Sequence, residues 1–252
     1  MTIAWAWLLV VGAVVGVLSG VFGVGGSSVA TPLLGLLGVA GVQAVASPLP
    51  ATIPVAVSAG VAYARSGEVR WRIAGLSLLG AAPFGVLGAL LARVVGGPAL
   101  LVASGIVVVV VGARLIRPIS EDTRAAGVQR RESWPRLVGL TTIVGLLTGL
   151  LANGGGFLLV PLYLLVFGLK MRSAAGTSLA VIAGLSVPTV IAHWVVGNID
   201  WRIGLLFALG AVPGAYIGSH VAHKVAQRWT RQAFGWLLVL FGVYFTLREL
   251  LA

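Results

Sequence analysis

Charged residues and cysteine are what this sequence has least of. Of its 252 residues only 9% are charged and none is cysteine, whereas 59% are hydrophobic. Soluble domains carry about 25% charged residues, so this chain has too little charge to cover a water-facing surface but suits a lipid-facing one. Without cysteine there is no disulfide and no thiolate metal site. The composition therefore predicts a membrane protein.

Acidic residues are rarer still, with six Asp and Glu against 17 Lys and Arg, which leaves a net charge of +11. Such a surplus can indicate nucleic-acid binding. The basic residues, however, lie in short gaps between apolar runs, as in the loops of membrane proteins. The enzyme motifs GxxxxGK[ST], HExxH and GxSxG are absent as well. We therefore predict lipid bilayer as the surroundings, with no nucleic-acid partner, no catalytic residue, no metal site and no cofactor.

The apolar runs are long enough to cross a bilayer, and they form two sets of five. A bilayer core about 30 Å thick needs roughly 20 apolar residues per helix. The segments are residues 3–22, 28–39, 43–64, 73–92 and 98–116 in the first half, and 136–152, 157–169, 173–196, 203–222 and 232–250 in the second. The second segment of each half is short for a span, which is typical of a broken or re-entrant helix.

The two halves also match each other in register. A shift of 129 places Gly16, Gly20, Gly25, Gly26 and Pro32 on Gly145, Gly149, Gly154, Gly155 and Pro161. A shift of 130 places Trp71, Arg72, Ile73 and Pro83 on Trp201, Arg202, Ile203 and Pro213. Glycine-rich sequences match each other easily, but the Trp-Arg-Ile triplet and the prolines indicate a duplication. We predict a first repeat at 1–117, a cytoplasmic linker at 118–135 and a second repeat at 136–252.

Basic residues predict how the repeats sit in the membrane, because Lys and Arg collect on the cytoplasmic side. If the repeats are inverted, 14 of the 17 basic residues fall on one side, and Arg93, Arg202 and Arg248 fall on the other. If they are parallel, the split is 11 to 6. The predicted fold class is therefore an all-α multi-pass membrane protein of two inverted repeats, each with about five helical segments including one short broken or re-entrant helix. Its linker lies in the cytoplasm and both termini lie outside the cell membrane.

A glycine cluster follows the first helix of each half and opens a short helix that bears Pro32 or Pro161. Glycine leaves no side chain to block a ligand. The start of a helix presents free N–H groups and a partial positive charge, which suits an anion. The predicted substrate contacts are Gly25, Gly26, Ser27, Ser28, Asn153, Gly154, Gly155 and Gly156. The alternative is that these glycines only allow close helix packing.

The third segment of each half carries a second polar group. In the first half Ser47 and Thr52 accompany three prolines, of which Pro48 is the first. Prolines break or kink helices and free carbonyl groups, which are tolerated at depth only where protein or water satisfies them. This predicts a cavity-lining segment, with Thr177 and Ser178 of the second half as further substrate contacts. Alternatively, each segment is a kinked helix whose hydroxyls bond their own backbone.

Ionisable residues within the predicted spans are few, and no Asp or Glu lies there. His193 is the most embedded, but it lies about one turn from the end of its segment and suits an interfacial histidine better than a proton relay. The interfacial interpretation is stronger for His220 and His223, which lie near a helix end. Arg72 and Arg202 occupy matched positions and are either interfacial anchors or anion-attracting groups at the two mouths.

Taken together, these motifs resemble the TauE/SafE family of sulfite exporters over nearly the whole chain. They are the duplicated G-x-x-x-G-x-x-G-x-G-G unit with its short proline-bearing helix, A-A-G-T-S-L at 174–179 and G-N-I-D-W at 197–201. The resemblance implies transport of sulfite, a sulfonate such as sulfoacetate, or a related oxyanion. It places the site around Gly25, Gly26, Asn153, Gly154, Gly155, Thr177 and Ser178. In the first half Ser47-Pro48-Leu49-Pro50 replaces the G-T-S-L string, which predicts two unequal half-sites.

The function we expect is secondary transport of a small sulfur-containing or organic anion by alternating access, with export as the favoured direction. The sequence does not distinguish coupling by a proton, coupling by sodium and uncoupled transport. A passive anion channel or facilitator is the alternative. A membrane-embedded enzyme is third, because no nucleophile, acid–base pair or metal cluster is visible. No oligomeric state is predicted.

Overall fold

The computed structural model describes residues 5–39, 41–95, 98–117, 134–150, 156–195 and 197–251, which are helical throughout apart from turns and short loops. The helices of the first half are α1 (Trp5–Phe22), α2 (Gly26–Leu36), α3 (Gly41–Ala46), α4 (Leu49–Arg65), α5 (Trp71–Val95) and α6 (Pro98–Ile116). Those of the second half are α8 (Trp134–Leu150), α9 (Gly156–Leu165), α10 (Met171–Val195), α11 (Trp201–Lys224) and α12 (Gln227–Leu251). The predicted all-α class is confirmed for these residues.

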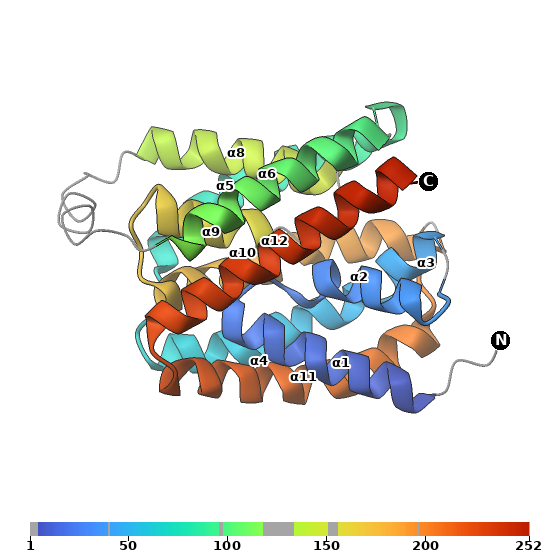
Figure 1. Ribbon diagram of the computed structural model, residues 1–252, viewed down its shortest axis with the longest axis horizontal. Coiled ribbons are helices and arrows are strands. Elements are labelled where there is room, and N and C mark those ends of the chain that lie inside the picture. Colours follow the sequence, from blue (N-terminus) through green and yellow to red (C-terminus); the bar gives the residue numbers. More distant parts are fainter. Residues whose placement is uncertain are drawn as a thin grey trace.

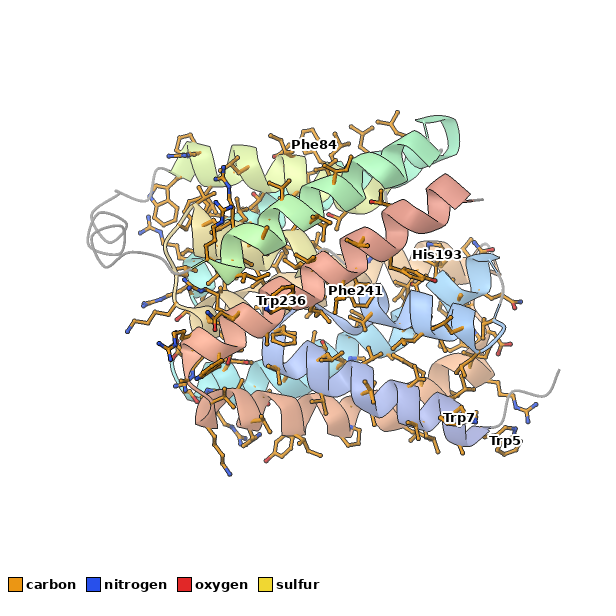
Figure 2. The ribbon with its side chains drawn as sticks, viewed as in Figure 1. Trp5, Trp7, Phe84, His193, Trp236 and Phe241 are labelled. Carbon is orange, nitrogen blue, oxygen red and sulfur yellow. The ribbon has the colours of Figure 1, made fainter. Side chains whose placement is uncertain are left out.

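Within the described residues, five helical stretches are long and apolar enough to cross a membrane, namely Trp5–Phe22, Gln43–Arg65, Trp71–Gly88, Met171–Val195 and Trp201–Lys224. By contrast, α9 has 10 residues and spans about 15 Å at the usual helical rise, roughly half of a bilayer core. Large apolar side chains such as Trp7, Phe84 and Trp236 are exposed (Figure 2), as lipid contact requires. The chain is therefore a helical membrane protein with short helices among its spans.

The third segment of the first half is divided, as its prolines predict. α3 ends at Ala46, and α4 starts after Pro48, which is its N-cap, with Pro50 in the first turn. Proline is tolerated there because the first N–H groups of a helix have no carbonyl partner within it. The third segment of the second half is instead one unbroken helix, α10, which continues through Pro188. The two halves thus differ at this segment.

The helices form layers (Figure 1). α1 and α11 lie along one side of the bundle, α5 and α8 along the opposite side, and α4 and α10 between them. Both chain termini lie at one end, whereas α6 ends and α8 starts at the other. α8 begins at Trp134, two residues before the predicted start of the second repeat, and residues 118–133 lie outside the described part of the chain.

The most extensive helix contacts join the two halves. α1 packs on α11, and the corresponding helices of the other half, α8 and α5, pack on each other. α6 packs on α12, and α4 packs on α10. The contact of α1 with α11 corresponds to that of α8 with α5, because α8 is the counterpart of α1 and α5 is the counterpart of α11. In the other two contacts, each helix packs on its own counterpart in the other half. The bundle is therefore interleaved rather than divided into two separate units.

Glycines at four-residue spacing bring α1 and α11 together. A β-carbon added at Gly12, Gly16 or Gly20 would overlap the carbonyl oxygen of Phe207, Ala211 or Ala215, respectively. In return, a β-carbon added at Gly210, Gly214 or Gly218 would overlap the carbonyl oxygen of Leu9, Ala13 or Val17. Small residues at this spacing let helix backbones approach in membranes, where van der Waals packing drives association. The two helices are therefore in backbone contact along most of α1.

We predict that Gly16→Ala lowers the free energy of unfolding. The added methyl group meets the Ala211 carbonyl, and overpacking of this kind typically costs about 1–3 kcal/mol. Gly75→Ala is the matched control, because no atom lies within 4 Å of a β-carbon added at Gly75. Thermal unfolding midpoints of the purified proteins in detergent measure the difference. A Gly16→Ala protein that unfolds at the temperature of Gly75→Ala would contradict this account of the α1–α11 contact.

Candidate functional site

The short helices of the two halves meet near their starts. α1 ends at Phe22, and the chain turns back through residues 23–25 into α2. Gly23 and Gly25 both have φ of 73°, a left-handed backbone that favours glycine, and Val24 between them is fully buried. A β-carbon added at Gly156, the first residue of α9, would overlap the backbone of Val24. The turn before α2 and the start of α9 are therefore in direct backbone contact.

α10 forms a wall of this contact. A β-carbon added at Gly23 would overlap the Cα atom of Ala175, so the turn rests on the α10 backbone. Ser178 follows one turn further along, on the same face of the helix. Ser178 is fully buried, and its hydroxyl has no hydrogen-bond partner among the described residues. A donor is thus available beside the turn.

α2 starts in a buried place without a side-chain cap. Its N-cap residue, Gly25, has no side chain with which to bond the first turn. The first N–H groups of a helix have no carbonyl partner within it. In that first turn the Ser27 side chain is 1% exposed, and in the described structure its hydroxyl has no partner either. Free N–H groups and a free hydroxyl together form a donor set suited to an anion.

Ser19 is a third buried hydroxyl near the turn, and the sequence prediction omitted it. It lies in the last turn of α1, where its carbonyl accepts the N–H of Gly23 at 2.8 Å. Its own hydroxyl is fully buried, with no partner in the part of the chain that is described. The sequence does mark this position, because the shift of 129 places Ser19 on Thr148. Both are hydroxyl residues, and each is followed by a glycine, Gly20 or Gly149.

Thr177, a predicted substrate contact, bonds a loop of the other half. Its hydroxyl oxygen accepts the backbone N–H of Arg70 at 3.1 Å, in the loop between α4 and α5. In the first half, the Ser47 hydroxyl accepts the backbone N–H of Asp200 at 3.1 Å, in the loop between α10 and α11. Each bond joins the third segment of one half to the residue that precedes the Trp-Arg-Ile triplet of the other. Two similar hydroxyl contacts, one position apart in the register of 129, therefore join two equivalent loops to the other half.

The two matched arginines lie at helix starts rather than at the glycine turn. The Arg72 guanidinium carbon lies 4.0 Å from the ring centroid of Trp134, and that of Arg202 lies 4.6 Å from the ring centroid of Trp5. Both arginines are exposed. Cation–π contacts with tryptophan at the ends of spans are typical of interfacial anchors. This geometry favours the interpretation of Arg72 and Arg202 as interfacial anchors over the alternative that they attract anions at the two mouths.

His193 lies in the last turn of α10, at the end of the bundle that holds the termini (Figure 2). It is 18 residues beyond Ala175, which corresponds to about 27 Å along a helix. Its Nδ1 atom lies 3.5 Å from the Asn198 side-chain nitrogen, in the loop that follows. His193 is therefore remote from the glycine turn.

Asn153, Gly154 and Gly155 lie outside the described residues, as does the side chain of Ser28. The candidate site consists of the other predicted contacts that surround the turn, namely Gly25, Gly26, Ser27, Gly156 and Ser178. None of them is charged, and the side chains nearest to a β-carbon added at Gly26 are those of Val15 and Phe207. Nowhere in the described residues do three His, Asp or Glu side chains gather to hold a metal ion. The arrangement suits binding of an anion through neutral donors.

Comparison with known proteins shows that the chain is similar to membrane transporters. The sulfite exporter TauE/SafE family matches residues 8–245 of the chain. A probable membrane transporter protein of Xylella fastidiosa (strain 9a5c) is 29% identical over 246 residues, which cover 92% of this chain and 91% of that protein. The probable membrane transporter protein YunE of Bacillus subtilis (strain 168) is 26% identical over 244 residues, 88% of either chain. No solved structure matches the chain.

We predict that Thr177→Val loosens the loop between α4 and α5, because it leaves the Arg70 N–H without its acceptor. A part-buried hydrogen bond of this kind contributes about 0.5–1.5 kcal/mol. Thr189→Val is the matched control on the same helix, since the Thr189 hydroxyl bonds only the Leu185 carbonyl of α10 itself. Hydrogen–deuterium exchange of residues 66–70 should be faster in Thr177→Val than in Thr189→Val. Equal exchange in the two variants would show that the Thr177 bond does not hold the loop.

Proposed function

This chain belongs to the sulfite exporter TauE/SafE family of membrane transporters, and we propose that it carries a small sulfur-containing or organic anion, such as sulfite or a sulfonate, by alternating access. The observation that carries the proposal is the backbone contact between Gly156 and Val24. It brings the start of one short helix onto the turn that opens the other. The favoured direction of transport is export.

The donors around this contact suit an oxyanion. Burying an anion is costly unless several hydrogen bonds replace its water. The uncapped start of α2 and the free hydroxyls of Ser27 and Ser178 offer such bonds. Sulfite and sulfonates carry several oxygen acceptors on one sulfur atom, so that one small group can meet donors from more than one helix. Asn153, Gly154, Gly155 and Ser28 belong to the proposed site by their sequence positions, and Thr177 by its place beside Ser178.

Alternating access is supported by the way the halves are related. We assign repeats to residues 1–117 and 136–252, in inverted orientation, with the linker at 118–135. In support, α1 and α8, the first helices of the two halves, start at opposite ends of the bundle (Figure 1). The Thr177–Arg70 and Ser47–Asp200 contacts also provide two similar closures. A carrier that opens one of them at a time would expose the site to each side in turn.

The proposed location is the cell membrane, with the linker in the cytoplasm and both termini outside. Basic side chains support this orientation. Arg65 ends α4, Arg172 is the second residue of α10, and Lys224 ends α11. These helix ends lie toward the end of the bundle where α6 ends (Figure 1). Accumulation of Lys and Arg at one end is the usual mark of the cytoplasmic side.

A passive anion channel remains the alternative, and its kinetics distinguish it from a carrier. A carrier saturates and exchanges labelled for unlabelled anion, because each cycle moves one bound anion across. A channel conducts down the gradient without such counterflow. No enzymatic reaction is assigned, since the family is one of membrane transporters.

We predict saturable counterflow of labelled sulfite in proteoliposomes that contain the purified protein. Ser27→Ala and Ser178→Ala each remove a hydrogen bond to a charged ligand worth about 1.5–3 kcal/mol. Each should therefore raise the half-saturating concentration at least about tenfold. Ser66→Ala is the control, because Ser66 is exposed and bonds only Ala62 of its own helix. The site assignment is wrong if all three variants transport sulfite alike. The carrier mechanism is wrong if the flux rises linearly with sulfite concentration and shows no counterflow.

We predict that equivalent loops of the two repeats face opposite sides of the membrane. Because the chain has no cysteine, Ser66→Cys and Asn198→Cys each carry a single thiol, in the loop after the third segment of each half. A membrane-impermeant maleimide added to intact cells should label Asn198→Cys at once. Ser66→Cys should react only after the membrane is broken. Labelling of both from the same side would exclude inverted repeats.

A further inference from the structure

A histidine at the end of α11 has a buried ring nitrogen without a partner. The Nδ1 atom of His223 lies 2.7 Å from the Ser219 carbonyl oxygen. A carbonyl oxygen only accepts, so Nδ1 carries the hydrogen, and in the neutral ring Nε2 is a bare acceptor. Nε2 is buried, and no described residue bonds to it. A free lone pair on a ring nitrogen is what a proton-binding site requires.

One side chain, that of Tyr63, links His223 to the helices α1 and α10 that flank the glycine turn. The ring centroids of Tyr63 and His223 are 5.0 Å apart. Tyr63 is fully buried, and its hydroxyl donates to the Gly20 carbonyl at 2.8 Å, three residues before the turn at Gly23. On its other side, a β-carbon added at Gly176 of α10 would lie 2.7 Å from the Tyr63 Cβ. Tyr63 therefore touches both walls of the turn as well as His223.

The charged groups around His223 leave its ring nitrogen free. The Arg172 guanidinium donates to the backbone carbonyls of Ala222 and His223, at 3.2 and 2.8 Å. Glu68 accepts a hydrogen bond from the Ser173 hydroxyl. α1, which packs along α11, carries no titratable side chain. Toward this end of the bundle, the titratable and charged groups on the surrounding elements are Tyr63 and Arg65 of α4, Glu68 and Arg70 of the α4–α5 loop, Lys170 and Arg172 around the start of α10, Tyr216, His220 and Lys224 of α11, and Arg228 and Arg231 at the start of α12.

A bound anion needs a positive charge that the described residues of the site do not supply. Gly25, Gly26, Ser27, Gly156 and Ser178 are all neutral, and an unbalanced buried charge is costly. A proton on Nε2 of His223 would provide one positive charge. The face of the Tyr63 ring would stabilise the resulting cation. Proton and anion would then each favour the binding of the other.

We propose that Nε2 of His223 is the proton-binding site of this transporter, and that a proton taken up there balances the charge of the bound anion. The inference rests on the proposed anion transport and names the proton as the ion coupled to it. One proton adds to the Nε2 lone pair as the anion binds, and it leaves when the anion leaves. By linkage, the anion must raise proton affinity by the same factor by which the proton raises anion affinity.

The test uses isethionate, a sulfonate that does not itself titrate between pH 5 and 8. We expect its affinity, measured by calorimetry on the purified protein, to weaken as pH rises from 5 to 8, by up to about tenfold per pH unit for one linked proton. His223→Gln should flatten this dependence. His220→Gln is the matched control, because His220 lies on the same helix with Nδ1 2.8 Å from the Tyr216 carbonyl, but is exposed. It should keep the dependence of the wild type.

A second readout needs no His223 variant. The chain has only three histidines, so nitrogen NMR of the labelled wild type, assigned with His193→Gln and His220→Gln, isolates the His223 ring. We expect isethionate to increase the fraction of His223 rings that carry a proton on Nε2 at a fixed pH. An unchanged protonated fraction, or pH-dependent binding that persists in His223→Gln, overturns this inference and leaves anion transport standing. If the wild type binds neither isethionate nor sulfite at any pH, the proposed function fails and this inference fails with it.

Discussion

Direct contact between glycine backbones is the constraint on which this bundle depends. In lipid, burying apolar side chains between helices gains little over leaving them in the bilayer, so close packing has to hold helices together. Along α1 and α11, the carbonyl oxygens of one helix occupy the places where side chains of the other would begin. The same kind of contact at Gly156 and Val24 brings two short helices together inside the bundle. The candidate site exists at this point because no β-carbon separates the two backbones.

The same constraint determines the chemistry of the site. A helix that starts with glycine has no side chain to cap its first N–H groups, so the donors of α2 stay available. Apolar neighbours such as Val15 and Phe207 keep the surroundings of Gly26 poor in competing polar groups. Hydrogen bonds are electrostatically stronger in such surroundings than in water. Neutral donors are therefore sufficient to recognise an anion, provided that its charge is balanced nearby.

Local and repeating features could be predicted from the sequence, whereas contacts between distant segments could not. The glycine turn of the first half, the short helices and the break at Pro48 follow from backbone preferences, and the prediction of each agrees with the described residues. The Thr177–Arg70 bond joins residues 107 apart, and nothing local marks it. His223 looked interfacial from its place near a helix end. Its Nε2 atom is buried, and the Tyr63 ring against which it lies belongs to α4 of the other half.

Divergence between the halves is concentrated in the candidate site rather than in the contacts that hold the frame. Each half has a hydroxyl that holds a loop of the other half, although Ser47 and Thr177 lie one position apart in the register of 129. By contrast, Ser27 corresponds to Gly156, and Ser178 corresponds to Leu49. The difference fits the proposed carrier, which needs a closure at each end but binds one small anion in one position at a time. Unequal donors remove the second, equivalent binding position that a symmetric site would create.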